Sequence, residues 1–313
     1  MRALHVPAAG EKPQIGDLPT PAVADGAVLI RVRAAALNPI DNVIAAGYLT
    51  GMLPHEYPLV LGRDAAGVVQ AVGAGVEHVK AGDEVFGHVL LAPPVQAGTL
   101  AEYAVLPAAT VALKPTGIDF VQAAALPLAA TAAAQAVDAI EARSGQTVLV
   151  NGASGGVGSY AVQLLAARGV TVIATGTDTA RLTGLGATTV VDRAAGPVAE
   201  QVLAAYPGGV DALINLFGNA TADVPLAAVR QGGTVSTLTQ APDADAATAA
   251  GVTVIAVMAA PVREVTGSLA EQAASGVLKV DVGAVITLDE ALDGLTAIAA
   301  GNAKGKTVVT FDN

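Results

Sequence analysis

The segment 146–167, QTVLVNGASGGVGSYAVQLLAA, limits the fold more than any other part of the sequence. A β-branched run predicts a strand that leads into a glycine-rich turn, and an apolar helical pattern follows directly. Gly155 lets backbone amides approach a pyrophosphate, and Gly158 lets the helix pack closely on the sheet. The N–H groups at the start of the helix stabilise the phosphate charge. The pattern therefore predicts a dinucleotide site, and a turn that binds no ligand is the alternative. The expected contacts are Ala153, Ser154, Gly155, Gly156, Val157 and Gly158.

The end of the next predicted strand bears on which nicotinamide cofactor binds. NAD sites place an Asp or Glu there to accept from the ribose hydroxyls. In this chain the strand 170–175 ends in Gly176 and Thr177, and Arg181 follows one helical turn later. Asp178 is evidence against a phosphate at this place, since its carboxylate either repels the phosphate or points away from it. For Arg181, a solvated charge on the helix surface is the alternative. A missing carboxylate and a nearby cation favour the 2′-phosphate, so the sequence predicts NADPH.

Short apolar runs alternate with alanine-rich helical segments from about residue 121 onward. This alternation is typical of βα units in a doubly wound parallel sheet. The predicted strands are 147–151, 170–175, 188–191, 212–216, 233–238 and 252–258. The part before residue 121 is rich in strands, predicted at 28–34, 65–72, 83–88 and 100–106. The tail is predicted as a strand (281–286), a helix (288–300) and a last strand (307–311). The fold class is therefore α/β.

Composition excludes several classes of function. With a net charge of −11, the chain has no excess of positive charge that could neutralise a row of phosphates, so nucleic-acid binding is not expected. The chain has no cysteine, which excludes disulfides and every cysteine-based zinc site. The most apolar stretches are far shorter than the roughly 20 residues of a membrane helix. Residues 1–10 have no long apolar core, so we expect a cytoplasmic protein.

Several short motifs, in their order and spacing, resemble the zinc-independent medium-chain dehydrogenase/reductases. That branch contains quinone oxidoreductases, zeta-crystallin and enoyl reductases. The motifs are 37–41 (LNPID), 58–67 (PLVLGRDAAG), 82–87 (GDEVFG), 98–103 (GTLAEY), 124–128 (AALPL), 153–158 (ASGGVG) and 305–306 (GK). The resemblance implies a GroES-like, β-rich catalytic domain from residues 1–120 and 262–313, interrupted by a Rossmann domain at 121–261. It places the active site in the cleft between the two domains.

The same resemblance argues against a metal ion. Zinc-dependent relatives have Cys or His in the segment matching 38–41 and a His-Glu pair after the glycine matching Gly62. Here those places hold Asn38, Asp41 and the pair Arg63 and Asp64. The four histidines are scattered, without the short spacing that puts two on one helix face. We expect no metal.

The resemblance also implies site residues. Tyr48, Asn38 and Asp41 match positions near the nicotinamide and the substrate, so they are the catalytic candidates; a packing tyrosine and an ordinary Asn-Pro helix start are the alternatives. Thr131 matches a residue that meets the nicotinamide amide. Further cofactor contacts, besides Gly176, Thr177 and Arg181, are expected at Arg193, Asn219, Ser236, Thr237, Leu238, Thr239, Val257, Met258, Ala259 and Lys306. For Lys306, a surface lysine is the alternative.

Without a metal, oxidation of a simple alcohol is disfavoured, because nothing stabilises an alkoxide. Hydride transfer to an enone, enal or quinone spreads the negative charge onto a carbonyl oxygen, where hydrogen-bond donors stabilise it. We therefore expect an NADPH-dependent quinone or enone reductase acting on a small molecule. The alternatives are a non-catalytic NADPH-binding protein and an enoyl reductase on a carrier-bound thioester. A short-chain reductase is excluded, since no tyrosine has a lysine four residues later.

Assembly follows from the last strand of the predicted Rossmann sheet, 252–258 (VTVIAVM). An exposed apolar edge strand is an aggregation hazard unless something pairs with it. Pairing with the same strand of a second copy gives a continuous sheet, as the family commonly has. We expect a homodimer.

Overall fold

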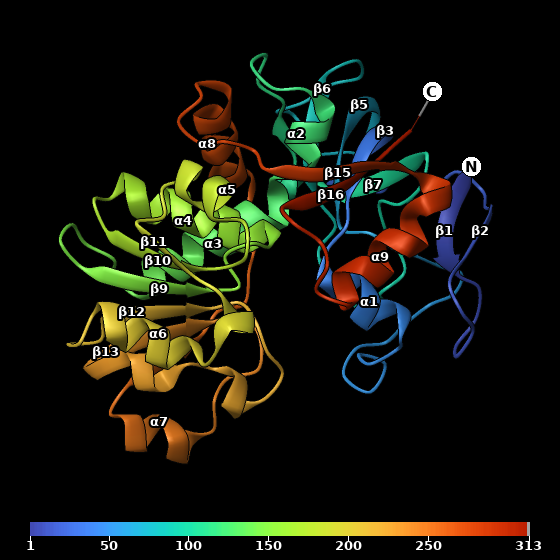
Figure 1. Cartoon of the computed structure of the whole chain (residues 1–313). Coiled ribbons are helices and arrows are strands. Elements are labelled where there is room, and N and C mark those ends of the chain that lie inside the picture. Colours follow the sequence, from blue (N-terminus) through green and yellow to red (C-terminus); the bar gives the residue numbers. More distant parts are fainter. Residues whose placement is uncertain (312–313) are drawn as a thin grey trace. The chain divides into compact units, whose positions relative to one another are not determined.

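The computed structural model describes residues 1–311, which form two compact units. The first unit comprises residues 1–129 and 260–311, and the second comprises residues 130–259. Figure 1 labels most of the helices and strands of both units. The predicted α/β class, with a β-rich unit and a doubly wound unit, is confirmed.

The first unit is built on a seven-stranded sheet in the order β15-β16-β3-β5-β6-β8, with β7 also paired to β3. A smaller sheet has the order β2-β1-β4. The strands are β1 (Arg2–Val6), β2 (Gln14–Asp17), β3 (Ala27–Ala36), β4 (Leu59–Val60), β5 (Asp64–Val72), β6 (Glu84–His88), β7 (Tyr103–Pro107), β8 (Ala112–Leu113), β15 (Val282–Thr287) and β16 (Lys306–Thr310). The helices are α1 (Pro39–Ala45), α2 (Phe120–Ala124), α8 (Arg263–Ala274) and α9 (Ala291–Ala299).

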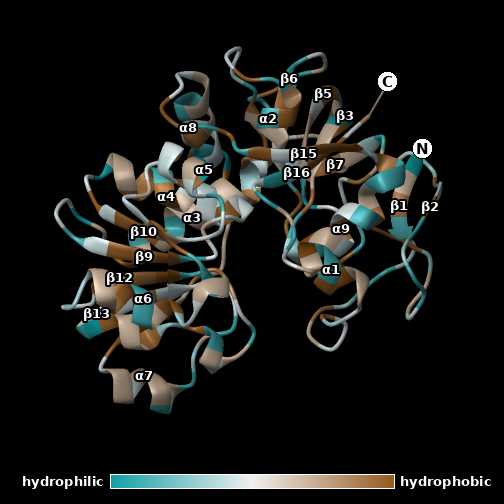
Figure 2. Ribbon diagram, viewed as in Figure 1, coloured by the Kyte–Doolittle hydropathy of each residue, from teal (hydrophilic) through white to brown (hydrophobic). Residues whose placement is uncertain are grey.

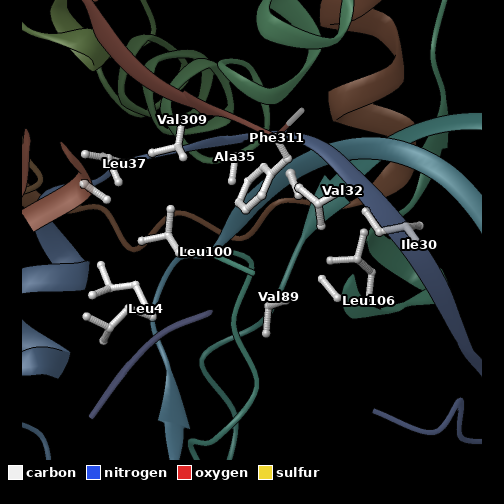
Figure 3. Close-up of a cluster of buried hydrophobic side chains, with 14 of the residues drawn as sticks. Leu4, Ile30, Val32, Ala35, Leu37, Val89, Leu100, Leu106, Val309 and Phe311 are labelled. Carbon is white, nitrogen blue, oxygen red and sulfur yellow. The ribbon is translucent and has the colours of Figure 1, made fainter. Parts of the chain in front are cut away.

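The large sheet brings residues 306–310 beside residues 27–36. β16 pairs antiparallel with β3, with Val309 opposite Ala35. Buried aliphatic side chains such as Leu4, Ile30 and Val309 form the core of this unit, and Figure 3 shows them with Phe311. Aliphatic burial of this kind is the main source of stability in a chain with 3% aromatic residues. The Rossmann domain was predicted to begin at residue 121, whereas residues 121–129 belong to the first unit, in which α2 packs on β3 and β5.

The second unit is a parallel sheet in the order β11-β10-β9-β12-β13-β14. Its strands are β9 (Thr147–Asn151), β10 (Thr171–Thr175), β11 (Thr189–Val191), β12 (Val210–Asn215), β13 (Val229–Thr237) and β14 (Thr253–Ala256). Its helices are α4 (Gly156–Ala167), α5 (Thr179–Gly184), α6 (Val198–Ala205) and α7 (Ala244–Ala250), and α3 (Pro127–Ala139) begins just before residue 130. In Figure 2 the strands β9, β10 and β12 are among the most hydrophobic ribbons, as a sheet covered on both faces requires.

Counted along the chain, this strand order is the Rossmann order, and its reversal lies between β9 and β12. Open α/β sheets bind ligands at the carboxyl ends of the strands beside such a reversal. The fold therefore predicts a ligand site at the ends of β9 and β12.

Candidate active site

The glycine-rich turn joins β9 to α4 in the second unit. Gly152 has a φ of +90°, which a residue with a side chain rarely adopts. A Cβ on Gly158 would lie 2.3 Å from the Gly152 oxygen, so only glycine allows α4 to pack this closely on the turn. At Gly155, the N-cap of α4, a Cβ would have the Gly152 oxygen at 3.6 Å as its nearest neighbour. The helix start is therefore open beside Gly155, and the turn fits a pyrophosphate bound by backbone amides.

The loop after β10 lies against this turn. A Cβ on Gly176 would be 2.4 Å from Ser154 Oγ, so the loop and the turn touch where glycine leaves room. Arg181 Nη2 donates to the Ser154 carbonyl at 3.2 Å. Asp178 Oδ1 accepts from the Arg181 backbone N–H at 3.1 Å and thereby caps α5. Capping gives the Asp178 carboxylate a structural role, and the cation of Arg181 stays beside the turn.

A row of polar side chains links the carboxyl ends of the central strands. Asn151 Nδ2 donates to Asn215 Oδ1 at 2.8 Å, and Asn215 Nδ2 donates to Thr239 Oγ1 at 3.0 Å. Thr175 Oγ1 accepts from the Gly152 N–H at 2.7 Å. This row spans β10, β9, β12 and the end of β13. Its hydrogen bonds link the carboxyl ends of these strands, where the ligand site is expected. Asn151, Thr175 and Asn215 were not among the predicted site residues, although each is a polar residue at the end of an apolar strand.

Two other predicted cofactor contacts of the second unit, Arg193 and Asn219, follow the carboxyl ends of β11 and β12. Thr131 in α3 is fully buried, and its hydroxyl has no hydrogen-bond partner among residues 1–311. The Arg193 guanidinium carbon lies 3.3 Å from the centroid of the Phe217 ring. Asn219 follows β12 and donates its backbone N–H to Asp223.

The residues predicted around the end of β13 and after β14 differ in their contacts. Ser236 Oγ donates to the Ala136 carbonyl, which turns this hydroxyl toward α3. Thr237 and Thr239 hydrogen-bond each other and Asn215. Met258 is 91% exposed. The predicted positions Thr177, Leu238, Val257 and Ala259 lie in the loops that follow β10, β13 and β14.

In the first unit, the catalytic candidates Asn38 and Asp41 are buried. Asn38 Nδ2 donates to Asp64 Oδ2 at 2.9 Å and to the Ala36 carbonyl at 3.3 Å, and its Oδ1 accepts from Lys306 Nζ at 2.6 Å. Asp41 Oδ2 accepts from the Asn38 N–H at 2.8 Å. These contacts give Asn38 and Asp41 structural partners, so a direct catalytic role for either stays a prediction.

The charges around Asp41 are unusually deeply buried. Burial raises the pKa of the Asp41 carboxyl to about 6, and the nearby Arg63 guanidinium opposes this rise. Arg63 is 2% exposed, and its Nε and Nη2 have no hydrogen-bond partner in the described part of the chain. Burial lowers the pKa of Lys306, whose ammonium also donates to the Leu37 carbonyl at 2.9 Å. Because this ammonium is used inside the first unit, the structure gives no support for the predicted contact of Lys306 with phosphate.

Tyr48, the remaining catalytic candidate, has a different environment. It follows α1 in a glycine-containing loop, its backbone N–H donates to the Val43 carbonyl, and it is 78% exposed. The alternative of a packing tyrosine is therefore disfavoured, because so little of its surface is covered by this chain.

Residues 1–311 contain no group of three or more histidine, aspartate or glutamate side chains placed to hold a metal ion. Nor does that part of the chain include a helix of the length and apolarity that a membrane crossing requires.

Comparison with known proteins agrees with this arrangement. Residues 24–116 match the family model of the alcohol dehydrogenase GroES-like domain, and residues 185–309 match that of the zinc-binding dehydrogenases. A 2-methylene-furan-3-one reductase of Solanum lycopersicum is 33% identical over 298 residues, covering 92% of this chain and 73% of the relative. A chloroplastic NADPH-dependent alkenal/one oxidoreductase of Arabidopsis thaliana is 36% identical over 228 residues, covering 71% of this chain and 57% of the relative.

Solved structures extend the similarity to the whole chain. The quinone oxidoreductase from Coxiella burnetii superposes with a TM-score of 0.87 at 28% identity, covering 100% of this chain and 99% of that one. The matches span from 43% to 73% of the length of the curated relatives, about half in most of them. The chain belongs to the medium-chain dehydrogenase/reductase family, in the branch that includes the quinone oxidoreductases.

Proposed function

We propose that this protein is an NADPH-dependent oxidoreductase that reduces a quinone or an α,β-unsaturated carbonyl compound without a metal ion. The observation that carries the proposal is the turn at 152–158, which fits a dinucleotide and has Arg181 in place of a ribose-binding carboxylate beside it. A relative named as an NADPH-dependent alkenal/one oxidoreductase and a structural neighbour named as a quinone oxidoreductase support it.

The chain's own residues account for binding. The amides at Gly155 and Gly156 hold the pyrophosphate, and Arg181 neutralises the 2′-phosphate. Thr131 Oγ1 hydrogen-bonds the carboxamide, since it is buried and has no other partner among the described residues. NADPH supplies the hydride that reduces the acceptor. The exposed Tyr48 ring contacts the acceptor.

The metal-free character rests on what surrounds Asp64. Its Oδ1 lies 2.7 Å from His88 Nδ1 and accepts the Leu128 N–H at 3.2 Å, while its Oδ2 accepts from Asn38. A cation at Asp64 would have to displace these donors and would lie close to the Arg63 charge. The residue set is therefore suited to hydrogen bonds rather than to a metal.

Stopped-flow spectroscopy tests the function directly. NADPH bound to the protein is mixed with a panel of quinones, enones and enals, and its absorbance is followed; NADH is the cofactor control. We expect oxidation of NADPH by at least one acceptor class, with protein that contains no zinc by elemental analysis. Binding of NADPH without reduction of any acceptor supports the alternative of a non-catalytic NADPH-binding protein.

No observation favours a carrier-bound thioester as the acceptor. A carrier's phosphate group would need an exposed cation close to Asn38, and Arg63 is only 2% exposed. A small-molecule acceptor is therefore the proposed substrate. A cytoplasmic location stays a prediction, and the named relatives include mitochondrial and chloroplastic proteins.

We also propose that the protein is a homodimer. β14 is the edge strand of the Rossmann sheet and pairs with β13. Its other edge presents backbone groups that a second copy of β14 can pair with. Sedimentation equilibrium at micromolar concentration is expected to give twice the chain mass.

A further inference from the structure

Four charged side chains of the first unit are buried around Asn38. Asp41 comes from α1, Asp64 begins β5 with Arg63 just before it, and Lys306 begins β16. Asp41 and Asp64 are 0% exposed, Arg63 is 2% exposed and Lys306 is 3% exposed. Two cations and two carboxylates make a balanced set. A buried charge that loses its counter-charge is strongly destabilising, so each of the four depends on the others.

Asn38 connects these charges. Its amide donates to Asp64 and to the Ala36 carbonyl, its Oδ1 accepts from Lys306, and its backbone N–H donates to Asp41. Both amide hydrogens are therefore used, and the one side-chain oxygen is held by the ammonium at 2.6 Å. The side chain is fixed in a single orientation from three elements.

This orientation determines where the next segment starts. Asn38 is the N-cap of α1, and the Asp41 carboxylate receives its N–H in a capping box. Tyr48 follows the last turn of the same helix, with its N–H on the Val43 carbonyl. Residues 38–48 thus form a continuous hydrogen-bonded segment from the buried cluster to the exposed ring.

We infer that Lys306 is a positioning residue for this segment: its ammonium holds Asn38 and balances Asp41 and Asp64, and so fixes α1 and the loop that carries Tyr48. A strand near the end of the chain thereby fixes the geometry of an acceptor-binding segment that begins 268 residues earlier. The precision that functional groups need comes from such supporting contacts.

The positioning role of Lys306 can also be followed through the pKa of Asp41. The charged and titratable groups that face Asp41 are Arg63, Asp64 and Lys306, and His88 contacts the Asp64 oxygen that Asn38 does not use. Arg63 and Lys306 lower the pKa of Asp41, whereas burial and Asp64 raise it. Removing the Lys306 charge therefore moves the titration of Asp41 to higher pH.

The test compares Lys306→Met with Lys80→Met in the full-length protein. Lys80 is the matched control, because its side chain is 83% exposed and pairs with Asp83 at the surface. For Lys306→Met we expect kcat/KM for the acceptor to fall by about tenfold or more, with the Kd for NADPH within about twofold of wild type. The acid limb of the pH profile of kcat/KM is expected to move upward. Lys80→Met is expected to match the wild type.

The activity measurement rests on the proposed function. A second measurement, hydrogen exchange, does not depend on it. Hydrogen exchange of the amides in 38–48 is expected to accelerate in Lys306→Met, while the amides in 146–167 keep their wild-type rates. A wild-type protein that reduces no acceptor contradicts the proposed function alone. Unchanged exchange in 38–48 overturns the inference about Lys306.

Charge balance provides a rescue experiment should Lys306→Met fold poorly. The double variant Lys306→Met/Asp41→Asn again has one cation and one carboxylate in the cluster, and the introduced amide oxygen can still accept the Asn38 N–H. We expect the double variant to be more stable than Lys306→Met. If the two substitutions destabilise the protein additively, the charges do not act together and the inference is overturned.

Discussion

His88 and Asp64 lie opposite each other on the antiparallel strands β6 and β5, with His88 Nδ1 2.7 Å from Asp64 Oδ1. Both side chains are almost completely buried. The register of two neighbouring strands places this pair, and Asp64 in turn accepts from Asn38 and from the Leu128 N–H. The pairing of β5 with β6 therefore determines where the Asp64 carboxylate lies relative to its hydrogen-bond donors.

Replacing His88 tests how much this pair stabilises the unit. His88→Leu leaves a buried carboxylate with one donor fewer, and we expect the free energy of unfolding to fall by about 2–4 kcal/mol. Urea denaturation measures the change. His78→Leu is the control: His78 Nε2 lies 3.2 Å from the Val111 carbonyl at a half-buried site, and a loss of about 1 kcal/mol or less is expected.

Alanine substitutions at two glycines of the turn should affect different properties: one the stability of the fold, the other the binding of NADPH. Gly158→Ala puts a methyl group 2.3 Å from the Gly152 oxygen, so we expect a loss of about 2 kcal/mol or more in stability. Gly155→Ala meets its nearest atom at 3.6 Å and should fold normally, but bind NADPH at least about tenfold more weakly. Gly184→Ala, with no atom within 4 Å, is the neutral control for thermal melting and calorimetry. Equal melting temperatures for all three variants would contradict the packing argument.

Arg181 is expected to determine cofactor preference. Arg181→Leu removes the cation beside Ser154, so the KM for NADPH should rise by about tenfold or more while that for NADH changes little. Steady-state kinetics with both cofactors measures this. A parallel rise for both cofactors would mean that Arg181 serves the fold rather than the 2′-phosphate.

The ionisation of Asp41 should make the free energy of unfolding depend on pH. Burial raises its pKa from 3.8 to about 6 in the folded protein, so the folded state binds the proton more tightly than the unfolded chain does. Stability contributed by Asp41 is therefore lost as pH rises through this interval, by about 3 kcal/mol in total. The difference in unfolding free energy between wild type and Asp41→Asn should fall from about pH 4 to about pH 7 and then level off. A difference that rises with pH would show that the pKa of Asp41 is lowered instead.

The proposed dimer predicts the effect of a charge on β14. Ile255→Lys introduces charges into the edge strand, where two copies would bring them together, so the protein should sediment as a monomer. Arg230→Ala, at an exposed residue that pairs with Asp211, should leave the dimer intact. A wild-type protein that sediments as a stable monomer would refute the proposed dimer.

The sequence predicted the Rossmann unit more accurately than the buried cluster, for a physical reason. The strand at 147–151 was predicted with its observed bounds, because a run of apolar residues followed by a glycine turn is a local signal. The short strands β1, β2, β4 and β8 were not predicted, since they lie outside the repeating alternation of apolar runs and helical segments that marks the Rossmann strands. The contact between Asn38 and Lys306 joins residues distant in sequence, and no local pattern encodes it. The motif containing Lys306 was noted, but its burial could be seen only in the fold.

The pairing of β16 with β3 also bears on the order of folding. Residues 130–259 form a continuous unit with its own sheet, so this part can fold as soon as it has been synthesised. The edge of β3 that receives β16 has no strand to pair with until residue 310 has left the ribosome. During that interval an apolar strand edge is open to other chains. Slow translation of residues 306–310, or their removal by proteolysis, should therefore promote aggregation through the first unit while leaving the second unit folded.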